Sequence, residues 1–424
     1  MADKKKLIEL LKSILIVLLL ISALILLYNT GYFSSAMERM GLIIQGGQDS
    51  AGTTDSGGDE IGNYGLAQAM EISVSARDGH RYSVMYDAEA VEEDYSRFSA
   101  FLAEALGSAT AIEVCDEAEW IRAVEGESVY IRYFAPQYIS FLAKRLGTEF
   151  GIGNSEAAAE EFCLSCENNA VFLYYREGTS FFRCQSAVSD TALRERIGEY
   201  RTNESFFSHA DRMLSGLKNS VLIQKNLSEA PAVKGGSISM SQILEPLMLA
   251  LDINSYTASQ YTESGGTSVY LDGNSILRIS SSGLVRYELS GNSALRAADK
   301  VAQSILEFCW GIVGSTVGSF SESAQVYLSR TECDENGNYT VYFDYLVNGI
   351  PVQMSARHAA VMHFRGAGLE SAEFCFRAYS QTGQTLKVLP MYQAAAIASA
   401  KGADMISMIY YDTAESIECV WVNE

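Results

Sequence analysis

The chain has 424 residues, 48% of them hydrophobic, and a formal net charge of −21. This length suffices for two or three ordinary domains with cores of their own, which excludes a small scaffold held together by disulfides. The acidic balance argues against nucleic acid as a partner, because phosphate backbones are bound by clustered lysine and arginine.

The N-terminus has the pattern of a membrane anchor. Four lysines stand at or before its start, namely Lys4, Lys5, Lys6 and Lys12. The apolar run SILIVLLLISALILLY follows from Ser13 to Tyr28, and a helix that begins near Leu7 is long enough to cross a bilayer once. The positive-inside rule then places residues 1–12 in the cytoplasm as a basic tail, residues 13–30 in the membrane as a signal anchor, and the rest of the chain outside.

Two features of this anchor leave alternatives open. Ser34-Ser35-Ala36 offers the small-x-small pattern of a signal-peptidase site, so cleavage near Ala36 is the alternative to a retained helix. Small residues in the helix would let a second helix approach closely, and these are Ser13, Ser22 and Ala23. The two serines lie about half a turn off one face, so no small-xxx-small seam is predicted, and hydrogen bonds to the preceding turn also explain them.

Residues 31–63 are predicted to be a juxtamembrane segment and a tether. The stretch Gly46–Gly65 is rich in Gly, Ser, Thr and Asp and lacks apolar periodicity, as flexible linkers do. A first extracytoplasmic α+β domain is predicted over residues 64–230, where helical and alternating patterns mix. Its predicted elements are helix Ala88–Leu106, strand Thr110–Val114, helix Glu117–Val124, strand Ser128–Phe134, helix Pro136–Leu146, hairpin Ala170–Ala187, helix Ser189–Tyr200 and strand Val221–Gln224.

A low-complexity step marks the next boundary. Ser228–Ser237 (SEAPAVKGGS) contains one of only five prolines and predicts a linker between domains. A middle domain over 237–317 and a C-terminal domain over 318–424 are predicted beyond it, each an antiparallel sheet with one helix packed across it. Asn348-Gly349 between alternating strands is the strongest type of short hairpin signal.

The predicted elements of these two domains follow in chain order. The helices are Ser241–Leu251, Ala294–Cys309 and Met391–Gly402. The extended stretches are Tyr256–Tyr261, Thr267–Asn274, the hairpin Ser275–Leu289, Ala324–Cys333, Asn338–Leu346, Ile350–Arg357, Ala359–Phe364, Leu369–Tyr379, Met405–Tyr411 and Ser416–Val422.

The cysteines do not form a compact framework. There are eight of them: Cys115, Cys163, Cys166, Cys184, Cys309, Cys333, Cys375 and Cys419. Cys163 and Cys166 are the one close pair, which leaves a metal half-site, a redox pair and chance as alternatives. Cys309, Cys375 and Cys419 have apolar neighbours and are expected to be buried free thiols.

Catalytic patterns are equally scarce. Four histidines are available as imidazole bases: His80, His209, His358 and His363. His358 and His363 are five apart in an extended stretch, so their side chains are expected on opposite faces, and His209 is expected to be an ordinary, partly exposed residue. Ser215 and Lys218 have the SxxK spacing of penicillin-binding enzymes, but the other motifs of that site occur in the wrong order. The prediction is a protein with no catalytic residue, no cofactor and no bound metal.

One arrangement of elements resembles a known family. An N-terminal signal anchor is followed by VYLDGN, the hairpin ILRISSSGLVRYEL, the strands YTVYFDYLVNGIPVQ, the alanine-rich helix LPMYQAAAIASA and a terminal strand pair. This arrangement resembles the YycH and YycI proteins of Gram-positive bacteria, extracytoplasmic regulators of an essential cell-wall sensor kinase. The resemblance covers the C-terminal half and the anchor, and the length of the chain favours the three-domain YycH type.

The resemblance implies a protein without catalysis, whose transmembrane helix contacts a membrane sensor histidine kinase and which has a paralogous regulator as a further partner. We therefore expect a single-pass membrane protein with an α+β ectodomain of antiparallel sheets and helices, which modulates a two-component system of the cell wall through protein–protein contact. The alternative is a tethered envelope module that binds a ligand or surface without catalysis, with its pocket between the two C-terminal sheets.

Overall fold

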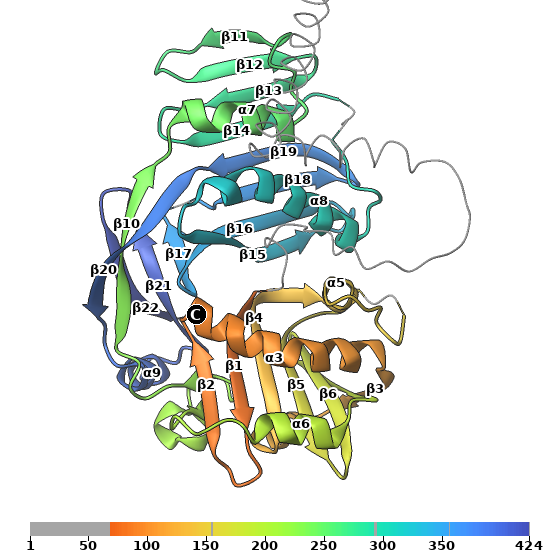
Figure 1. Cartoon of the computed structure of the whole chain (residues 1–424). Coiled ribbons are helices and arrows are strands. Elements are labelled where there is room, and N and C mark those ends of the chain that lie inside the picture. Colours follow the sequence, from red (N-terminus) through yellow and green to blue (C-terminus); the bar gives the residue numbers. More distant parts are fainter. Residues whose placement is uncertain (1–67, 154–155, 292–294, 356, 424) are drawn as a thin grey trace, which may run out of the picture. The chain divides into compact units, whose positions relative to one another are not determined.

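The first half of the described chain forms a seven-stranded antiparallel sheet (Figure 1). The computed structural model describes residues 68–153, 156–291, 295–355 and 357–423. The strand order is β2-β1-β4-β5-β6-β7-β3, so the first described strand is an inner one. The strands are β1 Ala69–Ser75, β2 Arg81–Met85, β3 Thr110–Cys115, β4 Ser128–Tyr138, β5 Ala158–Glu167, β6 Ala170–Glu177 and β7 Ser180–Gln185.

Helices cover this sheet, and most of them begin where the sequence places a capping side chain. The helices are α3 Ala88–Gly107, α4 Glu117–Glu125, α5 Ile139–Arg145 and α6 Asp190–Ile197. Asp87, Asp116 and Ser189 each accept a hydrogen bond from the backbone N–H three residues later, which stabilises the starts of α3, α4 and α6. These three predicted helices are confirmed.

The predicted helix Pro136–Leu146 starts later than expected. Pro136 lies in strand β4, and α5 begins only at Ile139. The pairing of β4 with β5 shifts register between Arg132 and Gln137. A strand irregularity of this kind tolerates a residue without an N–H, so the proline marks a bulge here rather than the first turn of a helix.

The second half of the described chain forms an eleven-stranded sheet. Its order is β11-β12-β13-β14-β19-β18-β16-β17-β21-β22, with β15 paired to β16, and only β17 and β21 run parallel. The strands are β11 Ser259–Thr262, β12 Ser268–Asp272, β13 Ser275–Ile279, β14 Leu284–Leu289, β15 Ala324–Cys333, β16 Tyr339–Val347, β17 Ile350–Met354, β18 Ala360–Arg365, β19 Gly368–Cys375, β21 Ile406–Asp412 and β22 Ile417–Asn423. Strands of the predicted middle and C-terminal domains thus share one sheet, through the pairing of β14 with β19.

The segment predicted as a linker between domains is a strand. Residues Glu229–Ser237 form β10, which pairs antiparallel with β20, Arg377–Lys387. The two strands pack closely, which explains a glycine in this segment: a Cβ on Gly235 would lie 2.8 Å from the Arg377 guanidinium. The linker prediction over 228–237 was wrong because the partner strand lies about 150 residues away.

Two other elements differ from their predicted bounds. Helix α8 spans Ala302–Ser315 and not Ala294–Cys309, because Leu295 and Ala297 bond instead to the turn between β18 and β19. The predicted strand Leu369–Tyr379 is divided between β19 and β20 at Phe376, whose N–H donates to Gly283 O. The two remaining helices, α7 Met240–Ala250 and α9 Met391–Ala400, match their predictions.

All described residues belong to one compact unit with two buried apolar clusters. We name residues 68–223 the N lobe and residues 229–423 the C lobe. One cluster lies between the N-lobe sheet and helices α3, α5 and α6, and the other joins side chains of both lobes. The predicted α+β class with antiparallel sheets is confirmed. The predicted anchor, residues 13–30, lies outside the described residues, and none of the helices within 68–423 combines the length and the apolar character that a membrane crossing requires.

Candidate functional site

The two faces of the N-lobe sheet differ in polarity although both are buried. Ile72, Ile131 and Phe162 point to the apolar face beneath α3. The opposite face carries polar and charged side chains, since side chains alternate along a strand. These are Glu71, Ser73 and Ser75 on β1, Ser83 on β2, Ser128 and Arg132 on β4, and Glu161 and Ser165 on β5. Tyr130 on this face packs edge-on against Trp120 of α4 and against Phe207, so the polar face is sealed from solvent.

Four residues on this face form a row of alternating charge. The row consists of Glu71, Arg132, Glu161 and Arg176, on the adjacent strands β1, β4, β5 and β6. Each is the direct cross-strand partner of the next, the position at which opposite charges stabilise a sheet most. We call this set the charge row.

The two ends of the charge row are bonded very differently. At one end, Arg176 Nη1 lies 2.6 Å from Glu161 Oε1 and 3.2 Å from Ser220 Oγ. At the other end, Arg132 Nη1 stands 3.8 Å from Glu71 Oε1, and Arg132 Nη2 stands 3.6 Å from Oε1 of Glu160. Glu71 is 3% exposed, and its Oε1 has no hydrogen-bond partner in the described structure. A carboxyl group in this position is poorly stabilised as an anion.

Burial therefore dominates the protonation of Glu71. It raises the pKa of Glu71 from 4.5 to about 7, although the charge of Arg132 acts in the opposite direction. Burial also raises the pKa of Glu161, which Arg132 and Arg176 partly offset. Burial acts to lower the pKa of Arg132, but the carboxylates of Glu71 and Glu160 outweigh it, so the guanidinium stays charged. Burial thus raises the pKa of both carboxyl groups of the row, and Glu71 is the one without a close guanidinium contact.

The charge row touches the C lobe through one side chain. Arg132 Nη2 donates to Met405 Sδ at 3.4 Å, and Met405 immediately precedes β21. Three residues on, the Met408 N–H donates to Tyr86 Oη at 3.1 Å, and Tyr86 precedes the N-cap of α3. We call this contact zone between the lobes the seam.

The turn between β16 and β17 meets the N lobe at the same zone. Asn348 and Gly349 both have positive φ, as a tight two-residue hairpin requires, and this confirms the predicted hairpin. A hollow of about 120 Å³ lies beside the turn. Its lining comes from both lobes: Gln68, Ala69, Met70, Ala88, Val91, Glu92, Gln325, Leu346 and Gly349.

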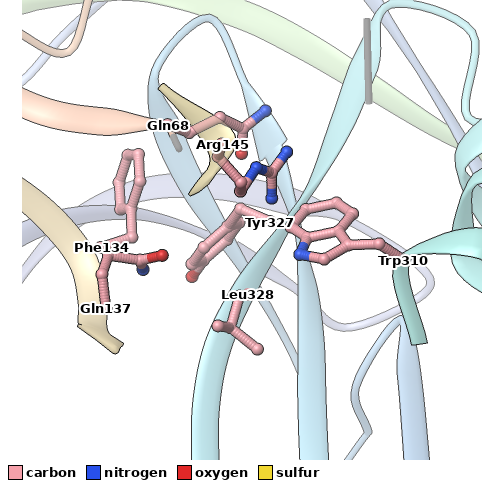
Figure 2. Close-up of a pocket in the computed structure, with 7 residues that line it drawn as sticks. All are labelled: Gln68, Phe134, Gln137, Arg145, Trp310, Tyr327 and Leu328. Carbon is pink, nitrogen blue, oxygen red and sulfur yellow. The ribbon is translucent and has the colours of Figure 1, made fainter. Parts of the chain in front are cut away.

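A second depression, the seam notch, is shown in Figure 2. Its lining residues are Gln68, Phe134, Gln137, Arg145, Trp310, Tyr327 and Leu328. The Arg145 guanidinium lies over the rings of Phe141 and Trp310, 5.2 and 5.3 Å from their centroids. Burial lowers the pKa of Arg145 to about 10. The notch has space for about one water, and Trp310 Nε1 is a buried donor without a partner among the described residues.

The residues that the sequence singled out for membrane function lie outside the described residues. These are the topology determinants Lys4, Lys5, Lys6 and Lys12 and the helix-contact candidates Ser13, Ser22 and Ala23. The predicted tether and the cleavage alternative near Ala36 also fall there.

The histidines and cysteines are dispersed over the described structure. His358 pairs with Asp344 at 2.9 Å, whereas His363 contacts Thr340. His209 is partly exposed, as predicted, and its ring bonds Glu125 and Asn219 O. Cys163 and Cys166 belong to different buried clusters on opposite faces of β5, so the close spacing in sequence does not bring the two thiols together. Within the described ranges, no three metal-binding side chains are grouped for a cation.

The charge row was missed from the sequence. Its members stand in largely apolar strand segments, singly in MEISV and YIRYF and beside a second charge in EEFCL and LYYRE. A charge in a buried strand signals that a partner exists, but the partner is set by strand order, which local patterns do not give.

Comparison with known proteins found no matching family model, no matching curated protein and no matching solved structure. The resemblance to the YycH and YycI proteins therefore stays a prediction.

Proposed function

We propose that this chain is a membrane-anchored extracytoplasmic regulatory protein that acts by protein–protein contact and modulates a membrane sensor histidine kinase of a two-component system controlling the cell wall. In this proposal residues 13–30 cross the membrane once, with the lysine-rich tail in the cytoplasm. The partners are the kinase and a paralogous regulator, and the protein itself catalyses no reaction.

The observation that carries the proposal is the place of β1. In the sequence the proposed anchor and tether precede this strand, which lies between β2 and β4 in the sheet. Glu71, the third residue of β1, is the end of the charge row that contacts Arg132. Among the described strands, β1 is therefore both nearest in sequence to the proposed anchor and next to the seam, which suits a protein that passes a signal along its chain.

A second candidate function is favoured by the hollow and the seam notch. Both depressions have lining residues from the two lobes, as ligand sites between domains commonly do. In that case the chain is a tethered envelope module that binds a ligand or a surface, and its membrane helix serves only as an anchor. This site differs from the one expected between the two C-terminal sheets.

The two candidates make different predictions about the membrane helix. We would purify the full-length protein in mild detergent, beside a variant whose residues 13–28 are replaced by an unrelated membrane helix, and identify co-purifying proteins by mass spectrometry. A histidine kinase recovered with the native helix and lost with the replacement supports the regulatory proposal. A partner set without any kinase, or one unchanged by the replacement, favours the tethered module.

A further inference from the structure

We infer that the charge row is a proton-operated coupling between the lobes: Glu71 gains and loses a proton, and its charge decides whether Arg132 holds the C lobe through Met405. The inference concerns the folded ectodomain and goes beyond the proposed function, since it names acidity as an input whatever the partner is.

The charge balance around Glu71 is set by the strands on one side of it. Within the described residues, the ionisable groups that face Glu71 come from β4 and from the strand beyond it, β5. They are Tyr130 and Arg132 on β4 and Glu160 and Glu161 on β5, with Arg176 behind Glu161. The residue paired with Glu71 on β2 is Met85, and the C lobe contributes Met405, so neither adds a charge.

Two guanidinium groups, Arg132 and Arg176, therefore serve three carboxylates, and Glu71 and Glu160 share Arg132. Arg132 lies within 4 Å of both Glu71 and Glu160, and Glu161 already holds Arg176 at 2.6 Å. A metal cation does not suit the cluster, because two guanidinium groups occupy it already. A proton suits the cluster, because it neutralises the least stabilised carboxylate and needs no extra space.

The Glu71 carboxylate and the Met405 sulfur compete for the Arg132 guanidinium. In the structure the Nη2 group of Arg132 donates to the Met405 sulfur, and in our inference this contact belongs to the form in which Glu71 is protonated. When Glu71 is charged, the unpartnered Oε1 of Glu71 attracts the same guanidinium more strongly than a thioether does. Arg132 then turns toward β1, and the contact with the C lobe weakens. Low external pH tightens the seam and high pH loosens it.

One backbone hydrogen bond across the seam can report whether the seam has loosened. The Met408 N–H donates to Tyr86 Oη across the seam, three residues after Met405. Loss of the contact between Arg132 and Met405 should raise the opening rate of this hydrogen bond, which amide hydrogen exchange measures. Comparison of variants at one pH removes the intrinsic pH dependence of exchange.

The test uses the full-length protein in detergent micelles and amide hydrogen exchange read by mass spectrometry at pH 6 and pH 8. Glu71→Gln keeps the shape of the protonated carboxyl at both pH values. We expect the peptide with Met408 to exchange equally in the wild type and Glu71→Gln at pH 6, and at least threefold faster in the wild type at pH 8. Glu93→Gln, at an exposed position on α3, is the matched control.

A second variant keeps the test decisive if Glu71→Gln does not fold. Met405→Leu removes the sulfur acceptor at similar volume, so we expect the same peptide to exchange at the faster rate at both pH values. The inference is overturned if the wild type and Glu71→Gln keep the same ratio at pH 6 and pH 8, or if Glu93→Gln reproduces the change. Neither result depends on a kinase, so this test and the test of the proposed function fail separately.

Discussion

The backbone of Gly349 lies so close to that of Asp87 that a Cβ on the glycine would stand 3.0 Å from the Asp87 nitrogen. Gly349 closes the hairpin between β16 and β17 in the C lobe, and Asp87 caps α3 in the N lobe. A turn residue of one lobe therefore rests on the first turn of the main helix of the other, with no room for a side chain between them.

Replacing this glycine should separate two costs. Gly349→Ala should destabilise the fold in two ways: the alanine must adopt a positive φ, here +78°, and its Cβ clashes with the start of α3. Gly366→Ala is the matched control, because Gly366 also has a positive φ, +58°, but its Cβ would meet nothing within 4 Å. We expect about 1–2 kcal/mol of destabilisation from φ in both variants and roughly 1–3 kcal/mol more at Gly349, measured by urea unfolding. Equal losses of unfolding free energy in the two variants would show that the lobes separate easily at this contact.

The two faces of β16 should respond unequally to truncation. Phe343 is fully buried and its ring packs edge-on against Trp310 at 5.0 Å, whereas Tyr342 on the other face is partly exposed. Phe343→Ala should lower the free energy of unfolding by about 3–5 kcal/mol, and Tyr342→Ala by roughly 1 kcal/mol. Thermal melts of both variants check this, and similar shifts would contradict the assignment of the buried face.

The stability of the protein should depend on pH through Glu71. The pKa of Glu71 is about 7 in the folded protein against 4.5 ordinarily, so between these values only the folded state holds the proton. The contribution of this proton to the free energy of unfolding is therefore fully present below pH 4.5 and is lost as pH rises through 7. The change is about 3 kcal/mol at most.

Glu71→Gln should remove this part of the pH dependence. Urea unfolding of the solubilised full-length protein at several pH values between 5 and 8, followed by circular dichroism, measures the slope. Glu93→Gln should leave the slope unchanged, since that side chain is 65% exposed. An identical slope in Glu71→Gln and the wild type would assign the pH dependence to other groups.

Breaking the buried Arg377–Asp412 pair should destabilise the protein far more than breaking a surface pair. The Arg377 guanidinium makes two-pronged contacts of 2.7 to 3.1 Å with Asp412, and Tyr379 Oη donates to the same carboxylate at 2.8 Å. Arg377→Met leaves this carboxylate buried and unpaired, at a cost of about 3–5 kcal/mol. Arg286→Met breaks an exposed pair with Glu373, and we expect its melting curve to overlay that of the wild type.

Thiol labelling should distinguish the cysteines by exposure. All eight are free, and Cys333 is the exposed one. Burial raises the pKa of Cys163 and of Cys309 well above the ordinary value, which keeps both thiols protonated. We expect a thiol-specific chromophore to label about one residue quickly in the native protein, and Cys333→Ser to abolish that phase. Rapid labelling that survives Cys333→Ser would contradict this ranking, because it would have to come from the partly exposed Cys115 or Cys419 or from a buried thiol.

Local signals predicted most of the secondary structure, and non-local pairing accounts for the errors. The helices predicted from Ala88 and Glu117 begin there, after the caps Asp87 and Asp116, and Asn348-Gly349 forms its hairpin, because the information for these features lies within a few residues. Strand β10 was taken for a linker because only its pairing with β20 makes it a strand.

The seam could not be predicted for the same reason. The approach of Gly349 to Asp87 and the alignment of Glu71 with Arg132 depend on how distant segments pair. The sequence shows a charge in a buried strand, but strand order and register decide which charge faces it.

The position of β1 also has a mechanical consequence. The strand is bonded along both edges, to β2 and to β4, and it is the first strand after the proposed tether. A force applied along β1 would load the hydrogen bonds on both of its edges together instead of breaking them one after another. With the anchor that we propose, tension on the chain would meet this doubly bonded strand, and Glu71 within it, before it met any other described strand.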